Sequence, residues 1–451
     1  MTLVDPTIFK AYDIRGFYPS QINEDTAYTI ARAVAYILKS KKCVIGKDVR
    51  LGSDAVYKSL IQGFLDSGCD VDYLGEVTSD SIYFAVGKYD YDLGIAITGS
   101  HNPKEYTGLK FTKKGVVPIS GASGMEDIKN ASIQNLSLAS QVKGTLRELD
   151  LSLEYRDFVL SFIDKSKIAP LKICVDTGNG VAGETVLSVL SQLPCIVTSI
   201  YAEKDGNFPN HLPDPQKEEN TRDLKKLVVD SKSDLGVSFD GDGDRMLIID
   251  EKGNYLSGYY LTAMLAKIAL KKHPGSKILH EPRLVWAIID TIKENGGIPV
   301  MCRAGHSFIK EKMRAENVVF GGETTGHFFY KENYYADNGV ISMLLFLEML
   351  SQERKPLSEI IEKYSNKYPF AGEFNNKVSD PDLIISQIKA NYSNRGYSLD
   401  ETDGITVENG REWRFNVRKS NTEPLVRLNV EGKSKEIVDA KVKEVLNLIQ
   451  N

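Results

Sequence analysis

The chain has 451 residues, of which 42% are hydrophobic and 26% are charged, as in an ordinary globular protein. This length provides for two to four domains. The formal net charge is −5 and no long basic run occurs, so the composition argues against nucleic acid as a partner.

Cysteine usage and apolar segments indicate the compartment. The five cysteines are scattered and form no Cys-x-x-Cys pair, which favours a reducing compartment and argues against a structural zinc site. The first ten residues lack the apolar stretch of a signal peptide. The most apolar window, Val340 to Leu350, is short and contains Glu348, so we predict a buried helix rather than a membrane span. We expect a soluble, cytoplasmic protein without membrane association.

The first third of the chain alternates predicted helices and strands, which is typical of a mainly parallel α/β sheet. Residues 9–16 look like a loop. Asn23 or Asp25 can cap a helix that extends to about Lys39. Residues 120–150, rich in Ser, Gly and charge, indicate a helix and a linker that close the first domain. The other predicted elements are a strand at 44–46, a helix at 53–66, and strands at 71–74 and 92–97.

The strand at 92–97 runs directly into Thr98-Gly99-Ser100-His101-Asn102-Pro103. Gly99 permits unusual backbone angles, and Pro103 biases the residue before it away from helix. Parallel sheets place ligand-binding groups at the carboxyl ends of their strands, where Ser100 lies. Ser100 is therefore a candidate for chemistry, although a serine in such a turn is more often a turn former. Lys110, just beyond, is either a site residue or a solvated surface lysine.

The α/β pattern restarts with a predicted strand at 171–176, followed by a glycine-rich turn and an apolar helix to about Leu190. The turn contains Gly178-x-Gly180-x-x-Gly183, which matches the dinucleotide-binding fingerprint, but that motif is weak by itself. No acidic residue about twenty positions further on follows a clear second strand. We therefore prefer a tight strand-to-helix turn at this place.

Asp240-Gly241-Asp242-Gly243-Asp244-Arg245 lies between predicted strands at 235–239 and 246–249. Three carboxylates at alternating positions can converge on one cation, and hard oxygen ligands select Mg²⁺ or Ca²⁺. An EF-hand is excluded because Arg245 stands where that loop requires glycine and because the flanking segments are strands. The segment therefore predicts a metal site.

A third α/β unit begins near Gly258, with a strand at 277–279 and a helix at 285–293. Two polar loops follow predicted strands in this unit. The first contains His306, and the second is Gly322-Glu323-Thr324-Thr325-Gly326-His327. A carboxylate such as Glu323 can accept two hydrogen bonds from a vicinal diol, and a neighbouring hydroxyl adds selectivity.

Residues 351–370 are charged and contain two prolines, which indicates an interdomain helix and hinge before a smaller α+β domain. In this last domain, residues 418–424 connect predicted strands at 413–417 and 425–430. Their arginine, hydroxyls, amide and backbone N–H groups suit a phosphate dianion. These groups include Arg418, Ser420, Asn421 and Thr422.

These segments, in this order, resemble the motifs of the α-D-phosphohexomutases, and within them the phosphomannomutase/phosphoglucomutase branch. Asp240–Arg245 is identical to the metal loop of that family. Thr98–Pro103 resembles its active-serine loop, with Gly99 where alanine is commoner, a change that we expect to cost little. Gly322–His327 resembles its sugar-binding loop, with Thr325 in place of serine. Arg418–Pro424 matches its phosphate loop, and 9–16 its N-terminal segment.

The resemblance implies an α/β fold of three related α/β domains plus a smaller C-terminal α+β domain around a central cleft. The implied domains are 1–150 with the active-serine loop, 151–256 with the metal loop, 257–366 with the sugar loop and 367–451 with the phosphate loop. It also implies interconversion of hexose 6-phosphate and hexose 1-phosphate, most of all of mannose. Ser100 would carry the phosphoryl group, and hexose 1,6-bisphosphate would be intermediate and activator.

The resemblance further implies the roles of individual residues. Mg²⁺ would be held by Ser100, Asp240, Asp242 and Asp244. The other catalytic candidates are Arg15, His101, Lys110, Arg245 and His306, among which His101, Lys110 and His306 are candidates for the general base. The substrate-binding candidates are Tyr12, Glu323, Thr325, His327, Arg418, Ser420, Asn421, Thr422 and Arg427.

Other functions stay open at this point. The enzyme could act mainly on glucose phosphates, as a phosphoglucomutase. It could instead be a phosphoserine hydrolase, although such an enzyme needs no group that recognises a diol in two orientations. A non-catalytic sugar-phosphate sensor would need neither Ser100 nor three aspartates. The expected partners are small-molecule sugar phosphates, and we expect a monomer.

Overall fold

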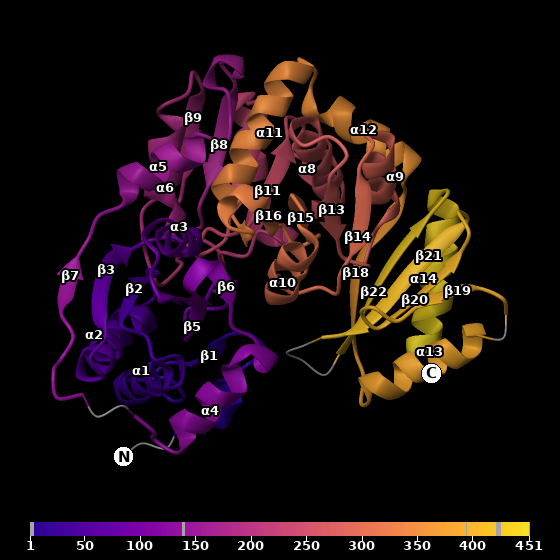
Figure 1. Ribbon diagram of the computed structural model, residues 1–451. Helices are drawn as coiled ribbons and strands as arrows, with labels where there is room; N and C mark the ends of the chain where they lie inside the picture. Colours follow the sequence, from indigo (N-terminus) through magenta and orange to yellow (C-terminus); the bar gives the residue numbers. More distant parts are fainter. Residues whose placement is uncertain (1–3, 138–139, 394, 421–424, 451) are drawn as a thin grey trace. The chain divides into compact units, whose positions relative to one another are not determined.

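The computed structural model describes residues 4–137, 140–393, 395–420 and 425–450. The chain forms two compact units, and each is built from two separate stretches of sequence. The first unit contains Met1–Tyr255 and Gly326–Arg354, and the second contains Leu256–Thr325 and Lys355–Asn451. The orange helix α11 in Figure 1 therefore belongs with the indigo and magenta elements. The boundaries of the four expected domains stay a prediction.

The first sheet of unit one has a parallel centre and antiparallel strands at one side. Its strand order is β1-β5-β4-β2-β3-β7, with β6 paired to β5. β4, β2, β3 and β7 are parallel, whereas β5 is antiparallel to both β4 and β1. The strands are β1 Ile14–Phe17, β2 Lys42–Lys47, β3 Asp70–Glu76, β4 Leu93–Ile97, β5 Tyr106–Lys113, β6 Val117–Pro118 and β7 Leu146–Glu148.

Four helices accompany this sheet. They are α1 Glu24–Leu38, α2 Leu51–Asp66, α3 Ser79–Tyr89 and α4 Met125–Ile133. The Asn23 side chain accepts a hydrogen bond from the Thr26 N–H, which confirms the predicted cap of α1. Apolar side chains of α1 and α2 enter one core with those of β2 and β4, including Ile30, Phe64 and Ile95.

Two strands of this sheet differ from the sequence-based prediction. The expected loop at 9–16 contains the start of β1, and the segment after the serine loop forms β5. Leu109 of β5 lies opposite Ile97 of β4. The sequence of β5, Tyr-Thr-Gly-Leu-Lys-Phe-Thr-Lys, is rich in polar residues, and most of it is buried, so it lacks the apolar run of a typical buried strand.

The second sheet of unit one has the order β12-β11-β10-β8-β9. β8, β9 and β10 are parallel, and β11 returns antiparallel to β10. The strands are β8 Lys172–Asp176, β9 Ile196–Ile200, β10 Leu235–Phe239, β11 Met246–Asp250 and β12 Tyr255–Leu256, and the helices are α5 Ser152–Leu160, α6 Ala182–Leu190 and α7 Arg222–Ser231. The glycine-rich segment connects β8 to α6, as the predicted strand-to-helix turn requires.

The segment that returns to unit one forms a hairpin and a long helix. These elements are β16 Phe328–Tyr330, β17 Ala336–Asp337 and α11 Gly339–Glu353. Most residues of α11 are buried, which confirms the predicted buried helix at this place. Short 3-10 turns occur at Pro6–Ile8, Lys114–Val116, Gly121–Ser123, Lys165–Lys167, Glu218–Thr221 and Lys331–Asn333.

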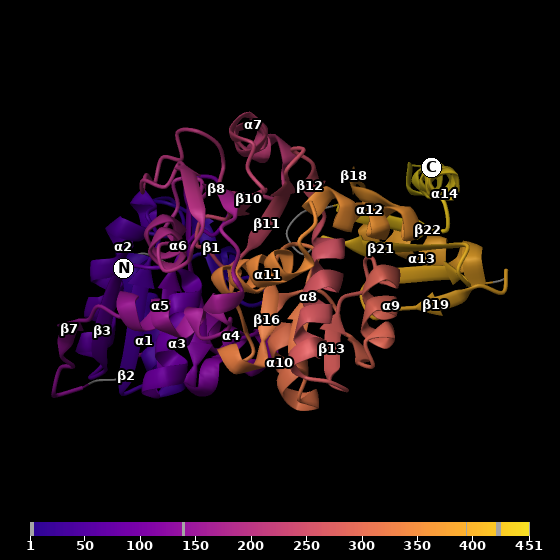
Figure 2. The same cartoon turned by 90° about the horizontal axis from the view of Figure 1, so that it is seen from above.

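Unit two begins with a parallel α/β layer. β13 lies between β14 and β15, and all three strands are parallel. Helices α8 and α9 lie side by side in both views (Figures 1 and 2). The elements are β13 Lys277–His280, β14 Ile298–Met301, β15 Phe320–Gly322, α8 Gly258–Lys272, α9 Trp286–Glu294, α10 His306–Glu316 and α12 Leu357–Lys367.

The rest of unit two is an antiparallel sheet of order β18-β22-β21-β20-β19. Its apolar face packs against α13 and α14 through residues such as Phe415, Val417 and Leu428. The alternate residues Arg414, Asn416 and Arg418 turn to the opposite face. The elements are β18 Phe370–Lys377, β19 Ser398–Asp400, β20 Ile405–Asn409, β21 Trp413–Lys419, β22 Leu425–Gly432, α13 Pro381–Ser393 and α14 Lys435–Gln450.

All five cysteines are free thiols. Among the described residues, no helix combines the length and the apolar character that crossing a membrane requires.

A half-buried histidine, His211, anchors the loop that follows β9. The His211 Nε2 lies 3.0 Å from Asp176 Oδ2, and its Nδ1 lies 2.8 Å from the Leu212 carbonyl oxygen. Burial lowers the pKa of His211, but Asp176 more than offsets this, so the pKa is raised above its ordinary value. The stabilisation of the fold by the charged His211–Asp176 pair is therefore fully present below the ordinary histidine pKa. It is lost as the pH rises through the raised pKa.

We expect His211→Gln to lower the melting temperature most at about pH 6, because the charged hydrogen bond contributes about 1–3 kcal/mol there. The difference in melting temperature between this variant and the wild type should become smaller towards pH 9. Melting curves from pH 5.5 to 9 measure it, with His273→Gln as the control for loss of a histidine elsewhere. A difference that stays constant over this range would contradict the charged Asp176 pair.

Candidate active site

The serine loop connects β4 to the antiparallel strand β5. Ser100 is buried and has a φ of +50°, in the left-handed region that residues other than glycine rarely adopt. Its N–H donates to Thr98 Oγ1 at 2.7 Å. Its Oγ lies 3.2 Å from His101 Nδ1 and 3.3 Å from Asp240 Oδ2. The loop thus presents the hydroxyl to an imidazole and a carboxylate.

Gly99 is required by the packing of this loop. A Cβ atom at position 99 would lie 2.8 Å from Arg50 Nε and 2.8 Å from the Tyr106 carbonyl oxygen. Both distances are too short, and both atoms are held in place. An alanine at this position would therefore force a shift of Arg50 or of the Tyr106 carbonyl, whereas the expectation that glycine costs little here stays a prediction.

The metal loop is the connection of the β10–β11 hairpin. Asp240, Asp242 and Asp244 are each buried, and they offer carboxylate oxygens that lie within 4.8 Å of one another. A Cβ atom at Gly241 would lie 2.6 Å from the Ser100 carbonyl oxygen. The glycine therefore allows the metal loop and the serine loop to touch, which brings the predicted phosphoryl carrier and the predicted metal ligands together.

Three cationic side chains surround this contact. Lys110 Nζ lies 2.6 Å from both Asp242 Oδ2 and Asp244 Oδ2. Arg245 Nε donates to Asp240 Oδ2 at 2.9 Å, and its Nη2 lies 3.5 Å from Ser100 Oγ. Arg15 lies beside the serine loop and also pairs with Asp13. Its Nη1 donates to Asn102 Oδ1 at 2.6 Å. All three therefore lie beside the serine loop or the aspartates, and their catalytic roles stay a prediction.

The charges around the cluster set the proton positions. Burial opposes a charged lysine, but Asp242 and Asp244 outweigh it and raise the pKa of Lys110 well above its ordinary value. Burial and the nearby cations, Arg245 first among them, lower the pKa of His101 well below its ordinary value. Lys110 is therefore charged and His101 neutral near pH 7. This argues against Lys110 as a general base in this state.

The aspartate cluster fits a divalent cation. Among the described residues, the buried Oδ1 atoms of Asp242 and Asp244 have no hydrogen-bond partner. Lys110 and Arg245 pair with other oxygen atoms of the three aspartates, so these two oxygens are left to bind a further cation. The donor set is made of hard oxygen atoms, which suits Mg²⁺ or Ca²⁺ and not a thiolate-binding metal. The cluster can therefore hold a metal ion.

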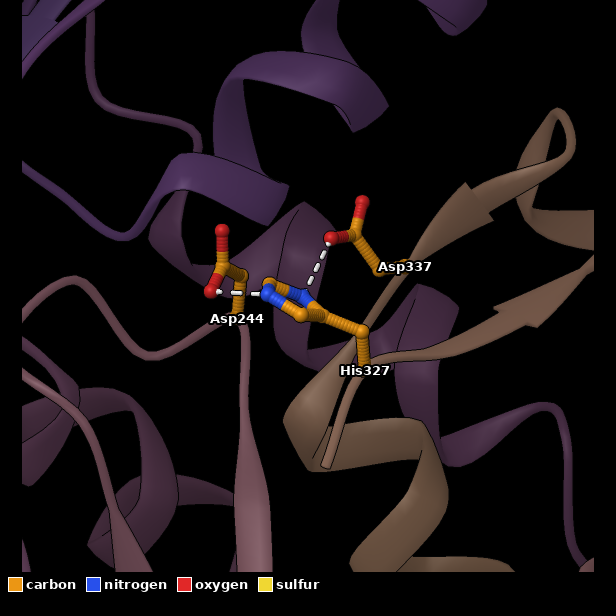
Figure 3. Close-up of side chains that lie close together, drawn as sticks. All are labelled: Asp244, His327 and Asp337. Carbon is orange, nitrogen blue, oxygen red and sulfur yellow. Dashed lines mark hydrogen bonds and ion pairs between the residues drawn. The ribbon is translucent and has the colours of Figure 1, made fainter. Parts of the chain in front are cut away.

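His327 lies beside the metal loop. Its Nδ1 lies 2.8 Å from Asp337 Oδ2 and 3.7 Å from Asp244 Oδ1 (Figure 3). Burial opposes the charged imidazole, but the two carboxylates outweigh it and raise the pKa of His327. His327 belongs to unit one, whereas Glu323 and Thr325 of the same motif belong to unit two. Its role in substrate binding stays a prediction.

Glu323 is the buried carboxylate of the predicted sugar loop in unit two. Its Oε1 accepts a hydrogen bond from the Gly305 N–H at 2.9 Å and lies 3.9 Å from Arg283 Nη2. These contacts at one oxygen set the orientation of the carboxylate. Thr325 is half-buried two residues further on, and His306 is the first residue of α10.

The polar face of the C-terminal sheet gathers arginines. Arg427 Nη1 lies 3.3 Å from Glu373 Oε1, Arg418 Nη2 lies 3.9 Å from Glu373 Oε2, and Arg283 Nη1 lies 3.8 Å from it. The Ser420 N–H donates to the Leu425 carbonyl at 3.0 Å. Three guanidinium groups around one carboxylate are suited to an anionic ligand. Asn421 and Thr422 lie outside the described residues, so their predicted roles have no structural account.

Tyr12 is half-buried just before β1, in the same unit as the serine loop. Sequence reasoning missed other residues of these two regions. Arg50 and Asp48 contact the serine loop, whereas Arg283 contacts the carboxylates of the sugar and phosphate regions. Arg50 and Arg283 each follow a parallel strand by a few residues. The rule that pointed to Ser100, a polar group at the carboxyl end of a strand, could have found them.

Comparison with protein families gives a consistent result along the chain. Models of the four phosphoglucomutase/phosphomannomutase domains match in order. Alpha/beta/alpha domains I, II and III match residues 6–136, 153–253 and 257–368, and the C-terminal domain matches residues 373–448.

Individual relatives match over nearly their whole length. A phosphomannomutase of Salmonella montevideo is 38% identical over 453 residues, covering 99% of both chains. A protein of Xanthomonas campestris pv. campestris named phosphohexose mutases is 39% identical, covering 98% of this chain and 99% of its own. A crystal structure of a phosphoglucomutase/phosphomannomutase family protein from Burkholderia thailandensis has a TM-score of 0.89 at 28% identity, covering 99% of this chain and 98% of its own.

Proposed function

Because the chain belongs to the phosphoglucomutase/phosphomannomutase family, we propose that it is a phosphomannomutase, an isomerase that interconverts mannose 6-phosphate and mannose 1-phosphate. The contact between Ser100 and the three-aspartate cluster carries this proposal. A serine that accepts and returns a phosphoryl group needs positive charge beside its hydroxyl, which a cation held by this cluster would supply.

In the proposed reaction, the phosphorylated Ser100 gives its phosphoryl group to the free hydroxyl of the sugar phosphate. The bond from phosphorus to Ser100 Oγ breaks, the bond to the sugar oxygen forms, and the proton of the sugar hydroxyl passes to a base. The product of this half-reaction is hexose 1,6-bisphosphate. After the sugar has reoriented, Ser100 Oγ takes the other phosphoryl group and regenerates the phosphoserine.

Asp240, Asp242, Asp244 and the oxygen of Ser100 would hold Mg²⁺. When bound, the ion supplies positive charge that neutralises the transferring phosphoryl group. Arg245 contributes further charge from its position between Asp240 and Ser100, and Arg15 fixes Asn102 of the same loop. Lys110 contributes charge as a protonated amine.

We propose that His101 exchanges a proton with Ser100 Oγ, which is supported by the 3.2 Å distance between its Nδ1 and that oxygen and by the lowered pKa of its ring. His306 remains the candidate from unit two. We propose that the phosphate that does not react is bound by the polar face of the C-terminal sheet. The proposed substrate-binding residues are Tyr12, Glu323, Thr325, His327, Arg418, Ser420, Asn421, Thr422 and Arg427.

The test is a coupled assay with mannose and glucose phosphates, given Mg²⁺ and a trace of hexose 1,6-bisphosphate. Formation of mannose 6-phosphate from mannose 1-phosphate supports the proposal. A much larger kcat/KM for glucose phosphate would indicate a phosphoglucomutase. Release of inorganic phosphate without an isomerised sugar would indicate a hydrolase, and binding without turnover would indicate a sensor.

The geometry of two binding orientations predicts the sugar selectivity. Only the hydroxyls near C3 and C4 can meet Glu323 and Thr325 after C1 and C6 exchange places, so C2 lacks a fixed partner. We expect kcat/KM to be about ten- to hundredfold higher for mannose phosphate than for glucose phosphate. This factor corresponds to one missing hydrogen bond at C2, which costs about 1–3 kcal/mol. Galactose 1-phosphate, altered at C4, should be rejected. Values of kcat/KM for the three sugar phosphates measure this.

The isosteric variant Glu323→Gln is the matched control, and it should lower kcat/KM for mannose and glucose phosphates by the same factor. Equal kcat/KM values for galactose and mannose phosphates in the wild type would remove Glu323 and Thr325 from sugar recognition.

We also propose domain boundaries after residues 150, 256 and 366. The four matched family domains begin and end close to them, which supports the boundaries. A monomer in the cytoplasm is proposed as well. Five free cysteines support a reducing compartment.

A further inference from the structure

The side chain of Arg50 lies inside the serine loop, although no part of the mechanism above uses it. Arg50 has no exposed surface, and its Nε lies 3.1 Å from Asp48 Oδ2. Its two terminal nitrogens donate to four backbone carbonyl oxygens of the loop. Nη2 donates to Ser100 (2.5 Å) and Asn102 (2.6 Å), and Nη1 to Pro103 (2.5 Å) and Tyr106 (3.4 Å).

These contacts use the whole donor capacity of the side chain. A guanidinium group has five N–H bonds, and here one points to Asp48 and four to the loop carbonyls. No N–H remains for a phosphoryl group on Ser100. Arg50 therefore acts on the reaction through the backbone of the loop and not by touching the transferred group.

The loop needs such a partner for two reasons. Ser100 has a left-handed backbone, which a residue with a side chain keeps only where its surroundings impose it. In addition, the loop turns several carbonyl oxygens towards one point, where they would repel one another without a cation. Asp48 completes the arrangement, because its Oδ2 also accepts the Gly99 N–H at 3.0 Å.

Packing prevents the guanidinium group from moving away. The ring of Phe208 lies with its centroid 4.8 Å from Arg50 Cζ. A Cβ atom at position 99 would lie only 2.8 Å from Arg50 Nε, so Gly99 leaves the space that the guanidinium group needs. A lysine could fill the volume but would offer a point charge with three donors in place of a planar group with five.

We propose that Arg50 is a positioning residue for phosphoryl transfer, which holds Ser100 in the turn that directs its Oγ to the aspartate cluster. This inference rests on the proposed function, since the transfer itself is part of that proposal. It assigns to the segment between β2 and α2 a role in the rate of transfer and none in the binding of the sugar phosphate.

The test is the variant Arg50→Lys, measured at a temperature where it is folded. We expect kcat to fall about 10²-fold, the scale of a displacement of a reacting group by about 1 Å. KM for the sugar phosphate should stay within threefold of wild type. Phosphorylation of Ser100 by saturating hexose 1,6-bisphosphate, followed by intact mass, should slow by the same factor as kcat.

Arg414→Lys is the matched control. Arg414 is also buried and also donates to a backbone carbonyl, that of Arg283 at 3.0 Å, but in unit two. It should raise KM, while phosphorylation of Ser100 at saturation keeps its rate. If Arg50→Lys does not fold, Asp48→Asn is used in its place, because it weakens the hydrogen bonds that hold Arg50 and the serine loop. This variant should also lower kcat without raising KM, by a smaller factor.

Phosphorylation of Ser100 at the wild-type rate in the folded Arg50→Lys or Asp48→Asn variant would overturn this inference alone. A rise in KM with an unchanged kcat in either variant would overturn it as well. A wild-type enzyme that takes up no phosphoryl group from the bisphosphate would overturn the proposed function, and this inference with it.

Discussion

Replacing Ser100 with alanine is expected to lower kcat by roughly 10⁴-fold or more, the scale seen when the residue that forms the covalent intermediate is removed. The physical reason is that Ser100 Oγ is the proposed phosphoryl acceptor, and alanine offers no oxygen atom in its place. The fold should survive, because one turn hydroxyl contributes little to stability. Activity in the coupled assay and a melting curve measure the two effects.

Intact mass provides the decisive control for this prediction. Wild-type protein incubated with hexose 1,6-bisphosphate should gain the mass of one phosphoryl group, and Ser100→Ala should not. The variant Ser191→Ala, on an exposed residue after α6, should behave as wild type. A Ser100→Ala variant that retains wild-type turnover would remove Ser100 from the mechanism.

The second large effect is expected at the metal loop. Asp242→Asn should lower kcat about 10²- to 10⁴-fold, because a bound ion contributes several kcal/mol of charge stabilisation. It should also weaken Mg²⁺ binding, since an amide oxygen carries no charge. Thorough chelation of the wild type should abolish activity, and Mg²⁺ should restore it. Titration calorimetry and the coupled assay measure both.

The stability of this variant is measured beside its activity, because Asp242 also pairs with a buried lysine. Its Oδ2 lies 2.6 Å from Lys110 Nζ, so Asp242→Asn is expected to lower the melting temperature of the metal-free protein as well. Asp230→Asn, in an exposed pair with Lys226, is the control of the same chemistry and should change neither activity nor Mg²⁺ binding. Full activity after chelation would make the loop a structural element.

Local sequence determined much of the site. Ser100 and the three aspartates follow apolar strands, and the spacing of the aspartates alone predicted a cation site. Strict alternation in Trp413-Arg414-Phe415-Asn416-Val417-Arg418 indicates one apolar and one polar face, and the structure places Arg418 on the polar one. In these cases the feature follows from the spacing or alternation of residues within one strand or one loop, so the local sequence is enough to predict it.

Other features depend on contacts between distant segments. Strand β5 is recognisable only through its pairing with β4, since its own sequence lacks an apolar run. His327 belongs to a sugar-loop motif in sequence but contacts Asp244 and Asp337, because the chain enters unit one again at Gly326.

What the sequence by itself determined is therefore a set of local groups: a serine in a turn, three carboxylates, and a loop with an arginine, two hydroxyls and an amide, each readable within about ten residues. Only the tertiary structure decided how these groups are held. Arg50 reaches across some fifty residues to bind the carbonyl of Ser100, and Gly99 provides the space for it. No local pattern specifies such a contact, because a buried guanidinium finds its partners only where the folded chain brings carbonyl oxygens together.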